Sequence, residues 1–499
     1  MEQETVLHIE GTVEQVLYRN EQNGYTVLDL DANGTLITVV GELGDVEEGE
    51  QLSVDGTYVN HVRFGVQFQA QYVERKLPED AINIQRYLSS GVIKGIGSAL
   101  AKKIVTAFGS QTLEIMEKQP TRLMEIRGIS PKKCETIAQE VQKIFALRSL
   151  MLFLQQYNIR SRYAMRAYQC YGSGAKEMIL ANPYLLCGMG IELPFEKAEI
   201  LADDLKVPKN AEQRILAGTC YILEHNTHNG YTCLPLDRLQ PKVCEYLQVS
   251  ESEFLSAYQA AQKEGNLVSY QKETREFVYL PAYYEAEQYI ADRIGVLRDF
   301  SAPEDQEIYL DLIKREETEQ GIQYAELQRK AILSALSRGL LILTGGPGTG
   351  KTTTLNGMIS LFEKQGYQVM LAAPTGRAAQ RISDLTGYEA KTIHRLLEVE
   401  FDMAGATKFR HNESNPLTCD VMIVDEMSMV DVLLFESLLR ALRFSCKLIM
   451  VGDSDQLPSV GAGNVLKDLI DSGQVPVVAL NQIFRQAQQS CIVTNAHKI

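Results

Sequence analysis

The stretch LILTGGPGTGKTTTLNGMISL, residues 341–361, decides the fold class of this 499-residue chain. Its centre, Gly345 to Thr352, matches the pattern G-x-x-x-x-G-K-[ST] without a mismatch. An apolar strand precedes the glycines and a helical stretch follows them, which is the context that a phosphate-binding loop needs. The N–H groups of such a loop converge on phosphate oxygens. The stretch therefore predicts a nucleoside triphosphate site in an α/β domain.

The residues of this loop have expected roles. Lys351 is expected to reach the β- and γ-phosphates, and the Thr352 hydroxyl is expected to contact a bound Mg²⁺. The strand–helix alternation that begins near residue 326 continues to the end of the chain, which indicates a parallel sheet. The residues expected to line the nucleotide are Gly345, Gly346, Pro347, Gly348, Thr349, Gly350, Lys351, Thr352 and Thr353.

Two further apolar strands end in polar residues. VMIVDEMSMVD, residues 421–431, delivers Asp425 and Glu426 to the end of a strand, where α/β sheets place their ligands. Asp425 suits Mg²⁺ coordination, and Glu426 suits polarisation of the attacking water. LIMVGDSDQLPSVGAGNVL, residues 448–466, places the Gln456 carboxamide where it can hydrogen-bond the γ-phosphate or the water. These three stretches together indicate a catalytic site.

At this point the sequence resembles a superfamily 1 helicase, and more closely the RecD/TraA branch. YAELQRKAI (324–332) is similar to the helicase Q motif, and LAAPTGRAAQRI (371–382) to motif Ia. KTIHRLL (391–397) is similar to the DNA-contact motif that follows, and LNQIFRQA (480–487) to motif IV. The APTGRAAQR and SVGAGN forms favour RecD over the UvrD/Rep branch.

The resemblance implies an ATP-dependent DNA helicase that moves 5′→3′ on single-stranded DNA and acts in DNA repair or recombination. It implies ATP and Mg²⁺ as cofactors, and single-stranded DNA and single-strand/duplex junctions as partners. By this resemblance Gln328 reads adenine and Arg485 meets the γ-phosphate, while Thr392 and His394 lie in a DNA-contact motif. A lone histidine is more often a packing residue, so that alternative stays open for His394.

The segment after residues 367–373 is expected to hold single-stranded DNA. Pro374, Thr375 and Arg377 follow a predicted strand there, and a hydroxyl, N–H groups and a guanidinium can together hold a sugar–phosphate backbone. The alternative for Arg377 and Arg381 is a solvated helix face.

Charge is distributed unevenly along the chain. The net charge is −15, but residues 81–177 hold 15 basic and 6 acidic side chains, whereas residues 1–80 hold 4 basic and 16 acidic ones. A polyanion would be steered to the basic segment. The acidic first segment alternates apolar and polar residues, as in a small β barrel of the oligonucleotide-binding kind, and we favour a structural or partner-docking role for it.

The basic segment contains an internal repeat of 63 residues, in which Phe108-Gly109 corresponds to Tyr171-Gly172. Each unit resembles a pair of helix–hairpin–helix motifs. In the first, Gly95 and Gly97 would let hairpin N–H groups approach a DNA phosphate, and Lys102 and Lys103 would neutralise it. A plain helical bundle is the alternative, and for the second unit, which lacks the hairpin glycines, it is at least as good.

We therefore predict a multidomain α/β protein with a P-loop, RecA-like parallel sheet. The expected regions are a small antiparallel β (OB-like) domain at 1–78 and tandem helix–hairpin–helix units at 79–205. A winged-helix-like domain at 206–300 and the first RecA-like motor domain at 301–499 follow. No stretch resembling the VHKSQG or TAITRA segments of a second motor domain occurs, so we expect these 499 residues alone to bind nucleotide but hydrolyse ATP poorly.

The remaining expectations are general. The N-terminus has no signal-peptide pattern and no apolar run reaches the ~20 residues of a membrane span, so a cytoplasmic monomer is expected. Protein partners would bind the N-terminal domain. Two alternatives to the helicase are considered: a DNA-binding interaction protein with a regulatory nucleotide domain, and a nuclease-associated subunit. The intact Asp425-Glu426 pair argues against the first, and no carboxylate cluster supports a nuclease site.

Overall fold

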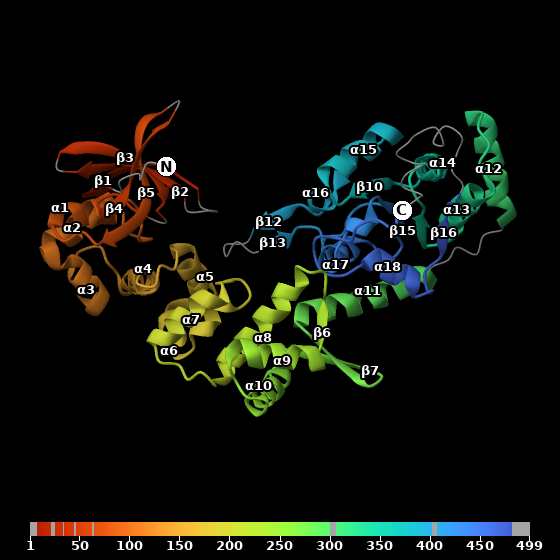
Figure 1. Ribbon diagram of the computed structural model, residues 1–499. Coiled ribbons are helices and arrows are strands. Elements are labelled where there is room, and N and C mark those ends of the chain that lie inside the picture. Colours follow the sequence, from red (N-terminus) through yellow and green to blue (C-terminus); the bar gives the residue numbers. More distant parts are fainter. Residues whose placement is uncertain are drawn as a thin grey trace. The chain divides into compact units, whose positions relative to one another are not determined.

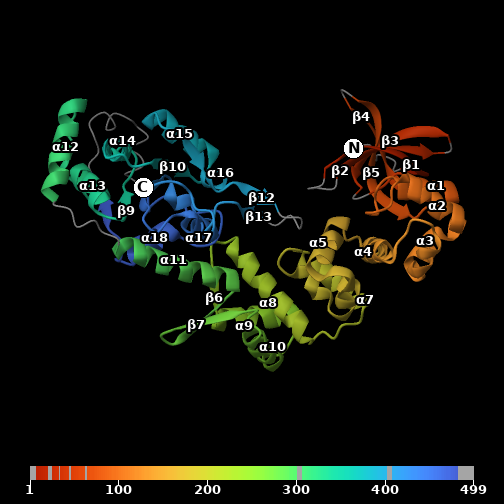
Figure 2. The ribbon, with the colours of Figure 1, turned by 180° about the vertical axis from the view of Figure 1, so that it is seen from behind.

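The computed structural model describes residues 7–20, 25–32, 34–43, 46–61, 64–299, 306–401 and 407–481. The chain forms two compact units, and Figures 1 and 2 show the elements of each. The first unit comprises residues 1–207 with 401–406, and the second comprises residues 208–400 with 407–499. No helix of the described residues is both long and apolar enough to cross a membrane.

The first unit begins with five strands that close into a barrel in the order β1-β2-β3-β5-β4. Inward-facing residues such as Val13, Leu28, Val39 and Phe68 are fully buried and form its core. Four of the five pairings are antiparallel, as expected for this small domain, and the β3–β5 pairing differs in being parallel. The strands are β1 (Leu7–Arg19), β2 (Tyr25–Ala32), β3 (Thr35–Glu42), β4 (Gln51–His61) and β5 (Gly65–Lys76).

Helices fill the rest of this unit. Apolar residues at helical spacing, among them Ile84, Ile104, Leu123 and Ile137, are buried in one shared core. The 63-residue repeat is visible in the backbone, because α2 and α5 both end at a left-handed glycine, Gly109 or Gly172. The helices are α1 (Ala81–Ser89), α2 (Ser98–Phe108), α3 (Thr112–Lys118), α4 (Pro131–Gln155), α5 (Ser161–Tyr171), α6 (Ala175–Ala181) and α7 (Phe195–Asp204).

The second unit opens with helices and a small antiparallel sheet of order β6-β8-β7. Ser250 and Glu253 form a reciprocal capping box that fixes the start of α10. The elements are α8 (Glu212–Thr227), β6 (Cys233–Pro235), α9 (Leu236–Leu247), α10 (Glu251–Lys263), β7 (Val268–Lys272) and β8 (Arg275–Tyr279). The β7–β8 hairpin extends beyond these helices (Figures 1 and 2).

A six-stranded sheet of order β11-β10-β14-β15-β9-β16 forms the centre of this unit, and every pairing in it is parallel. The predicted parallel α/β sheet is therefore confirmed. The strands are β9 (Leu340–Thr344), β10 (Val369–Ala373), β11 (Ala390–Thr392), β14 (Val421–Val424), β15 (Lys447–Gly452) and β16 (Val477–Ala479). A separate short ribbon pairs β12 (Val399–Phe401) with β13 (Thr407–Phe409).

Helices cover both faces of this sheet (Figure 1). The side chains of β9 alternate between two buried clusters, with Leu340 and Ile342 in one and Leu341 and Leu343 in the other. On the first face lie α11 (Pro281–Asp299), α16 (Ile393–Leu397), α17 (Val432–Ala441) and α18 (Val465–Asp471). On the second lie α12 (Gln306–Gln320), α13 (Glu326–Ser337), α14 (Lys351–Lys364) and α15 (Gly376–Thr386).

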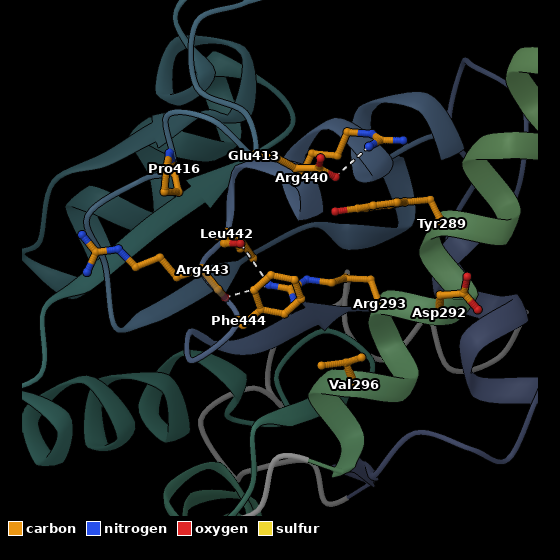
Figure 3. Close-up of a pocket in the computed structure, with 10 residues that line it drawn as sticks. All are labelled: Tyr289, Asp292, Arg293, Val296, Glu413, Pro416, Arg440, Leu442, Arg443 and Phe444. Carbon is orange, nitrogen blue, oxygen red and sulfur yellow. Dashed lines mark hydrogen bonds and ion pairs between the residues drawn. The ribbon is translucent and has the colours of Figure 1, made fainter.

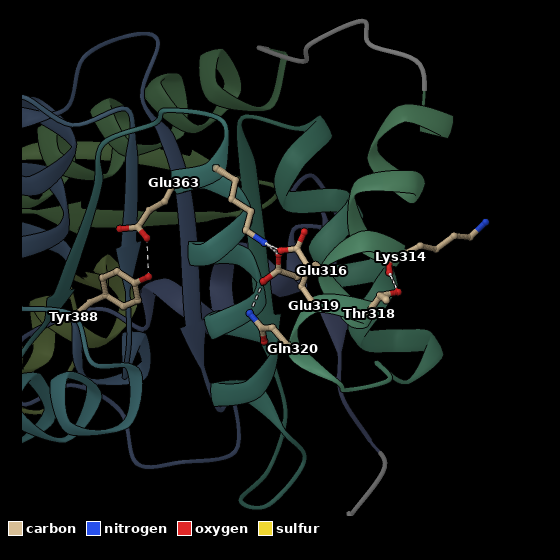
Figure 4. A network of polar contacts seen from close by, with 8 residues as sticks. Lys314, Glu316, Thr318, Glu319, Gln320, Glu363 and Tyr388 are labelled. Carbon is tan, nitrogen blue, oxygen red and sulfur yellow. Dashed lines mark hydrogen bonds and ion pairs between the residues drawn. The ribbon is translucent and has the colours of Figure 1, made fainter.

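A polar cluster attaches α12 to α14, the helix that begins at the phosphate loop (Figure 4). Lys364 pairs with both Glu316 and Glu319. Gln320 also donates to Glu316, whose side chain is fully buried. These contacts raise the pKa of Lys364 and keep its ammonium charged. A buried carboxylate needs such partners, so the network fixes where α12 crosses α14.

A second cluster attaches α11 to the sheet beside a cavity of about 520 Å³ (Figure 3). The buried guanidinium of Arg293 donates to the carbonyl oxygens of Leu442 at 3.0 Å and Arg443 at 2.7 Å, and the Phe444 ring lies 4.1 Å from it. This cavity lies beside the α17–β15 connection, at the N-terminal edge of the sheet. The phosphate loop follows the C-terminal end of β9, so the cavity belongs to the opposite edge.

Candidate nucleotide and DNA site

The predicted motifs meet at the C-terminal edge of the parallel sheet. The phosphate loop follows β9, Asp425 and Glu426 follow β14, and Asp453 follows β15, the strand between those two. The strand ends are in register, because Gly452 pairs with Thr344 and Val424 with Met450. Parallel strands carry their ligands at this edge. The motifs are thus brought together by the topology of the sheet.

The phosphate loop holds its shape through contacts of its own. Gly345 has φ +152°, and a Cβ there would lie 2.5 Å from the Leu480 carbonyl oxygen, so only glycine fits. The buried Thr349 hydroxyl donates to the Gly346 carbonyl at 2.8 Å. Gly348 and Gly350 are also left-handed, at φ +78° and +86°. Pro347, Gly348 and Thr353 are exposed, and Gly346, Gly350 and Thr352 are partly so, which leaves the loop open to a ligand.

Lys351 is the first residue of α14, and its side chain turns back over the loop. Its ammonium donates to the carbonyl oxygens of Gly345 and Gly346. Burial lowers the pKa of Lys351. The carboxylates of Asp453, Asp425 and Glu426 oppose that shift, which shows that all three lie within electrostatic reach of the ammonium.

Asp425 and Glu426 form a pair of neighbouring carboxylates. Burial raises the pKa of Asp425. Burial and then the charge of Asp425 raise the pKa of Glu426, while Arg381 and Lys351 lower it. Glu426 also adopts a left-handed backbone conformation, φ +53° and ψ +42°. Non-glycine residues rarely adopt it, and strained backbone of this kind concentrates at functional sites.

The loop after β15 carries one residue that the sequence prediction did not select. Asp453 is 8% exposed, and it lies within electrostatic reach of Lys351. The predicted residue Gln456 is exposed, and its backbone N–H donates to the Asp453 carbonyl at 3.3 Å. The signal for Asp453 was its position directly after the strand, the same position that Asp425 has after β14.

Gln328 contacts the phosphate loop from α13. Its Oε1 accepts from the Ala325 N–H at 2.9 Å, and its Nε2 lies 3.4 Å from the Gly350 carbonyl oxygen. The side chain is nearly buried, at 4% exposed. Both ends of the amide are therefore engaged within the protein. Recognition of adenine by Gln328 stays a prediction.

The predicted DNA-contact residues of the second unit lie at the C-terminal ends of the neighbouring strands β10 and β11 or directly after them. Pro374 and Thr375 are partly exposed, and the Thr375 hydroxyl caps α15 by accepting from Ala378 N–H at 3.2 Å. The Thr392 hydroxyl caps α16 in the same way, because it accepts a hydrogen bond from the Arg395 N–H at 3.2 Å. Arg377 and His394 are exposed, and the His394 ring lies 6.0 Å from that of Phe409.

The first unit contains the predicted hairpin. Gly95, φ +95°, and Gly97 lie in the exposed turn before α2, and Gly97 is the N-cap of that helix. A Cβ on Gly97 would meet nothing within 4 Å, so there is open space beside this turn. Lys102 and Lys103 are exposed on α2.

A second hairpin, 33 residues later, was not selected from the sequence. Gly128 has φ +109°, and the hydroxyl of Ser130 caps α4, accepting from the Lys133 N–H at 3.3 Å. Lys132 is exposed beside it. The signal was present in the sequence, because Ile126-Arg127-Gly128-Ile129 repeats the pattern of residues 93–96. In the 63-residue repeat, Asn158 takes the left-handed position of Gly95 with φ +55°.

Arg485 lies outside the described residues, so its predicted contact with the γ-phosphate has no structural description. The described part of the chain contains no group of three or more His, Cys, Asp or Glu side chains that could hold a metal ion by themselves.

Family models match four parts of the chain. The model "ATP-dependent DNA helicase YrrC, OB-fold domain" matches residues 6–78, and "SAM-like Helix-hairpin-helix tandem" matches 86–143. The model "ATP-dependent RecD2 DNA helicase HHH domain" matches residues 143–233, and "AAA domain" matches 328–462.

Curated proteins of known name are similar over the same regions. The ATP-dependent RecD2 DNA helicase of Deinococcus radiodurans is 29% identical over 512 residues, covering 98% of this chain and 69% of that protein. The RecD subunit of the RecBCD enzyme of Mycolicibacterium smegmatis is 44% identical, covering 29% of this chain and 30% of that protein. The RecD subunit of Haemophilus influenzae is 31% identical, covering 50% of this chain and 40% of that protein.

Sheet and site define a P-loop motor ATPase whose chain also carries a helix–hairpin–helix region. The matches to the RecD2 and RecD proteins identify the kind of motor. These matches support the resemblance to RecD-type ATP-dependent DNA helicases with an N-terminal helix–hairpin–helix region that the sequence motifs indicated.

Proposed function

We propose that this chain supplies the ATP-binding side of a helicase that couples ATP hydrolysis to 5′→3′ movement on single-stranded DNA and to duplex unwinding. The observation that carries the proposal is the meeting of Lys351, Asp425, Glu426 and Asp453 at one edge of the sheet. Phosphoryl transfer needs little covalent chemistry from the protein. It needs phosphate charge neutralised and a water oriented, and these residue types do both.

Lys351 and Thr352 act on the phosphates and the metal. The Lys351 ammonium exchanges the Gly345 and Gly346 carbonyls for phosphate oxygens, which are better partners for a desolvated cation. Thr352 and Asp425 offer the oxygen ligands that Mg²⁺ prefers, and the raised pKa of Asp425 marks a buried carboxylate whose charge a cation would offset. Bound Mg²⁺ would supply charge neutralisation on the β- and γ-phosphates.

Glu426 acts as the general base that takes a proton from the attacking water. Gln456 hydrogen-bonds the γ-phosphate or that water, and Arg485 meets the γ-phosphate. Gln328 reads adenine by exchanging its long contact with the Gly350 carbonyl, 3.4 Å, for the base. Asp453, in the loop after β15, favours the charged form of Lys351.

DNA is held by two surfaces in this proposal. In the second unit, Pro374, Thr375 and Arg377 contact the backbone of a single strand, with Thr392 and His394 beside them. In the first unit, the glycine turns and lysines of the two hairpins contact phosphates without reading sequence. We assign residues 206–300 to a winged-helix-like domain, because helices α8 to α10 are followed there by the β7–β8 hairpin.

The four regions bounded at residues 78, 205 and 300 act as barrel, DNA-binding, winged-helix and motor domains. The protein works as a monomer at a single-strand/duplex junction, in DNA repair or recombination. The acidic barrel docks protein partners through its surface rather than binding DNA, because its charge repels phosphate.

The test is the ATPase activity of the full-length protein with and without single-stranded DNA. The Lys351→Ala variant is expected to lose at least ~100-fold in kcat, the size of effect seen when one preorganised charge stabiliser is removed. Lys330→Ala, which removes an exposed lysine of α13, is the matched control and should keep its rate. Nucleotide binding without hydrolysis in the unmodified protein would instead favour an interaction protein with a regulatory nucleotide domain.

A further inference from the structure

Glu426, the candidate general base, forms an ion pair with Arg381. Nη1 of Arg381 lies 3.7 Å from Oε1 of Glu426, and the two side chains are 72% and 24% exposed. Arg381 lies on α15, the helix that follows β10, and Glu426 follows the adjacent strand β14. This ion pair therefore joins the proposed DNA-contact segment to the proposed hydrolytic site.

The position of Arg381 on α15 gives it a second possible partner. It lies four residues after Arg377, so both side chains emerge on one face of the helix. Arg377 belongs to the segment that, under the proposed function, holds the backbone of a single strand. Arg381 is thus placed between two anions, the Glu426 carboxylate and a phosphate of bound DNA.

A pair of this kind is easily exchanged. The Arg381 side chain is largely exposed and its nitrogen lies 3.7 Å from the carboxylate oxygen, so the pair contributes little to stability. A guanidinium–phosphate contact is bidentate and charge-assisted, so DNA can compete for the arginine. A carboxylate that is paired with arginine holds its lone pairs toward the cation and is a poorer base than a free one.

We propose that Arg381 is a positioning residue that exchanges Glu426 for a DNA phosphate, and thereby makes hydrolysis depend on DNA. Without DNA, Arg381 holds the Glu426 carboxylate away from the water. With DNA bound along α15, the guanidinium moves to a phosphate and Glu426 becomes free to accept a proton. This inference rests on the proposed function, because it requires single-stranded DNA at α15 and Glu426 as base.

Competition for one arginine has a consequence that does not require hydrolysis. Removing the Glu426 charge frees Arg381, so the E426Q variant should bind single-stranded DNA about two- to five-fold more tightly, the fold-change that corresponds to an exposed ion pair. That gain should disappear in the R381A background. The measurement is the fluorescence anisotropy of a labelled oligo-dT of about 15 nucleotides with the unmodified chain, R381A, E426Q and the double variant.

A matched control separates exchange from general repulsion between carboxylates and DNA. Arg315 and Asp311 form another exposed ion pair in the same unit, 2.7 Å apart and 71% and 59% exposed. D311N removes a charge without freeing Arg381. Its effect on DNA affinity should be small and equal in the presence and absence of R381A.

The outcomes are distinct. An E426Q gain that survives in the R381A background overturns the exchange while leaving the DNA site intact. Absence of any oligo-dT binding by the unmodified chain overturns both the exchange and the proposed DNA site. In the full-length protein, R381A should raise the DNA-free ATPase rate and lower the ratio of DNA-stimulated to DNA-free rate, and R381K should restore part of that ratio. A purely structural role would lower both rates together.

Discussion

At the scale of single residues, the Asp425–Glu426 pair that the proposed function requires lowers the stability of the fold. Two carboxylates lie next to each other at a partly buried strand end, and burial raises the pKa of both. An acid whose pKa is raised by folding binds its proton more tightly in the folded state than in the unfolded state. Stability is therefore lost as pH rises through the interval between the ordinary and the raised pKa.

The raised pKa of Asp425 predicts how Asp425→Asn changes stability. The substitution removes the charge that burial penalises and the repulsion that Glu426 feels, so the free energy of unfolding should increase by about 0.5–2 kcal/mol at pH 8. The gain should shrink when the pH is lowered to 5, because protonation of the native carboxyl group removes the same charge as the substitution. Urea unfolding at both pH values is the measurement, with the exposed-site variant Asp311→Asn as the control. A destabilised Asp425→Asn protein at pH 8 would contradict the account.

At the scale of elements, the packing of α14 against α13 and against Tyr324, which precedes α13, determines which substitutions α14 tolerates. A Cβ on Gly357 of α14 would lie 2.3 Å from the Tyr324 hydroxyl and 3.2 Å from Ile332 Cδ1. Gly295 of α11, in contrast, has nothing within 4 Å of such a Cβ. Two glycines inside helices thus have opposite packing environments.

Replacing Gly357 or Gly295 by alanine is therefore predicted to have opposite effects on stability. Gly357→Ala should destabilise the protein by about 1–3 kcal/mol because the site is already filled. Gly295→Ala should stabilise it by about 0.5–1 kcal/mol, the ordinary preference of a helix interior for alanine. Thermal unfolding of the two variants measures the difference. Equal shifts of the same sign would mean that α13 does not contact α14 as described.

The hairpin of the first unit gives a second prediction at this scale. Replacing Lys102 and Lys103 together by alanine should weaken DNA binding equally for all sequences. It should also reduce the slope of log Kd against log salt by about 1–2, since each phosphate contact contributes about one. Lys118→Ala is the control, because Lys118 already pairs with Glu114 at 3.0 Å on α3. An unchanged slope would favour the plain helical bundle.

The sequence predicted the parallel sheet and the positions of its motifs because each motif lies next to its strand in the sequence. Each phosphate or carboxylate motif follows its own apolar strand, and a parallel sheet must bring such strand ends to one edge. The parallel β3–β5 seam of the barrel was missed because it joins segments far apart in the sequence, and alternation alone does not fix strand direction. Some contacts join side chains from different elements, and the spacing of residues in the sequence does not reveal them. These are the contacts of Asp453 with Lys351, of Gln328 with Gly350 and of Arg381 with Glu426.

At the scale of the whole molecule, the account joins a nucleotide site and two DNA surfaces in one chain. The second unit carries the phosphate loop, the carboxylate pair and the α15 segment, while the first carries the glycine hairpins. The chain spans 69% of the length of the Deinococcus relative and at most 40% of the two RecD subunits described above. Coupling between hydrolysis and movement is therefore a property to be measured on the full-length protein.

Unwinding of tailed duplexes tests the central claim most directly. The full-length protein is given duplexes with either a 5′ or a 3′ single-stranded tail, in the presence of ATP and Mg²⁺, alongside its Lys351→Ala variant. The account predicts that the unmodified protein separates the 5′-tailed duplex and that the variant separates neither. Unwinding that survives Lys351→Ala, or that prefers the 3′ tail, would contradict it.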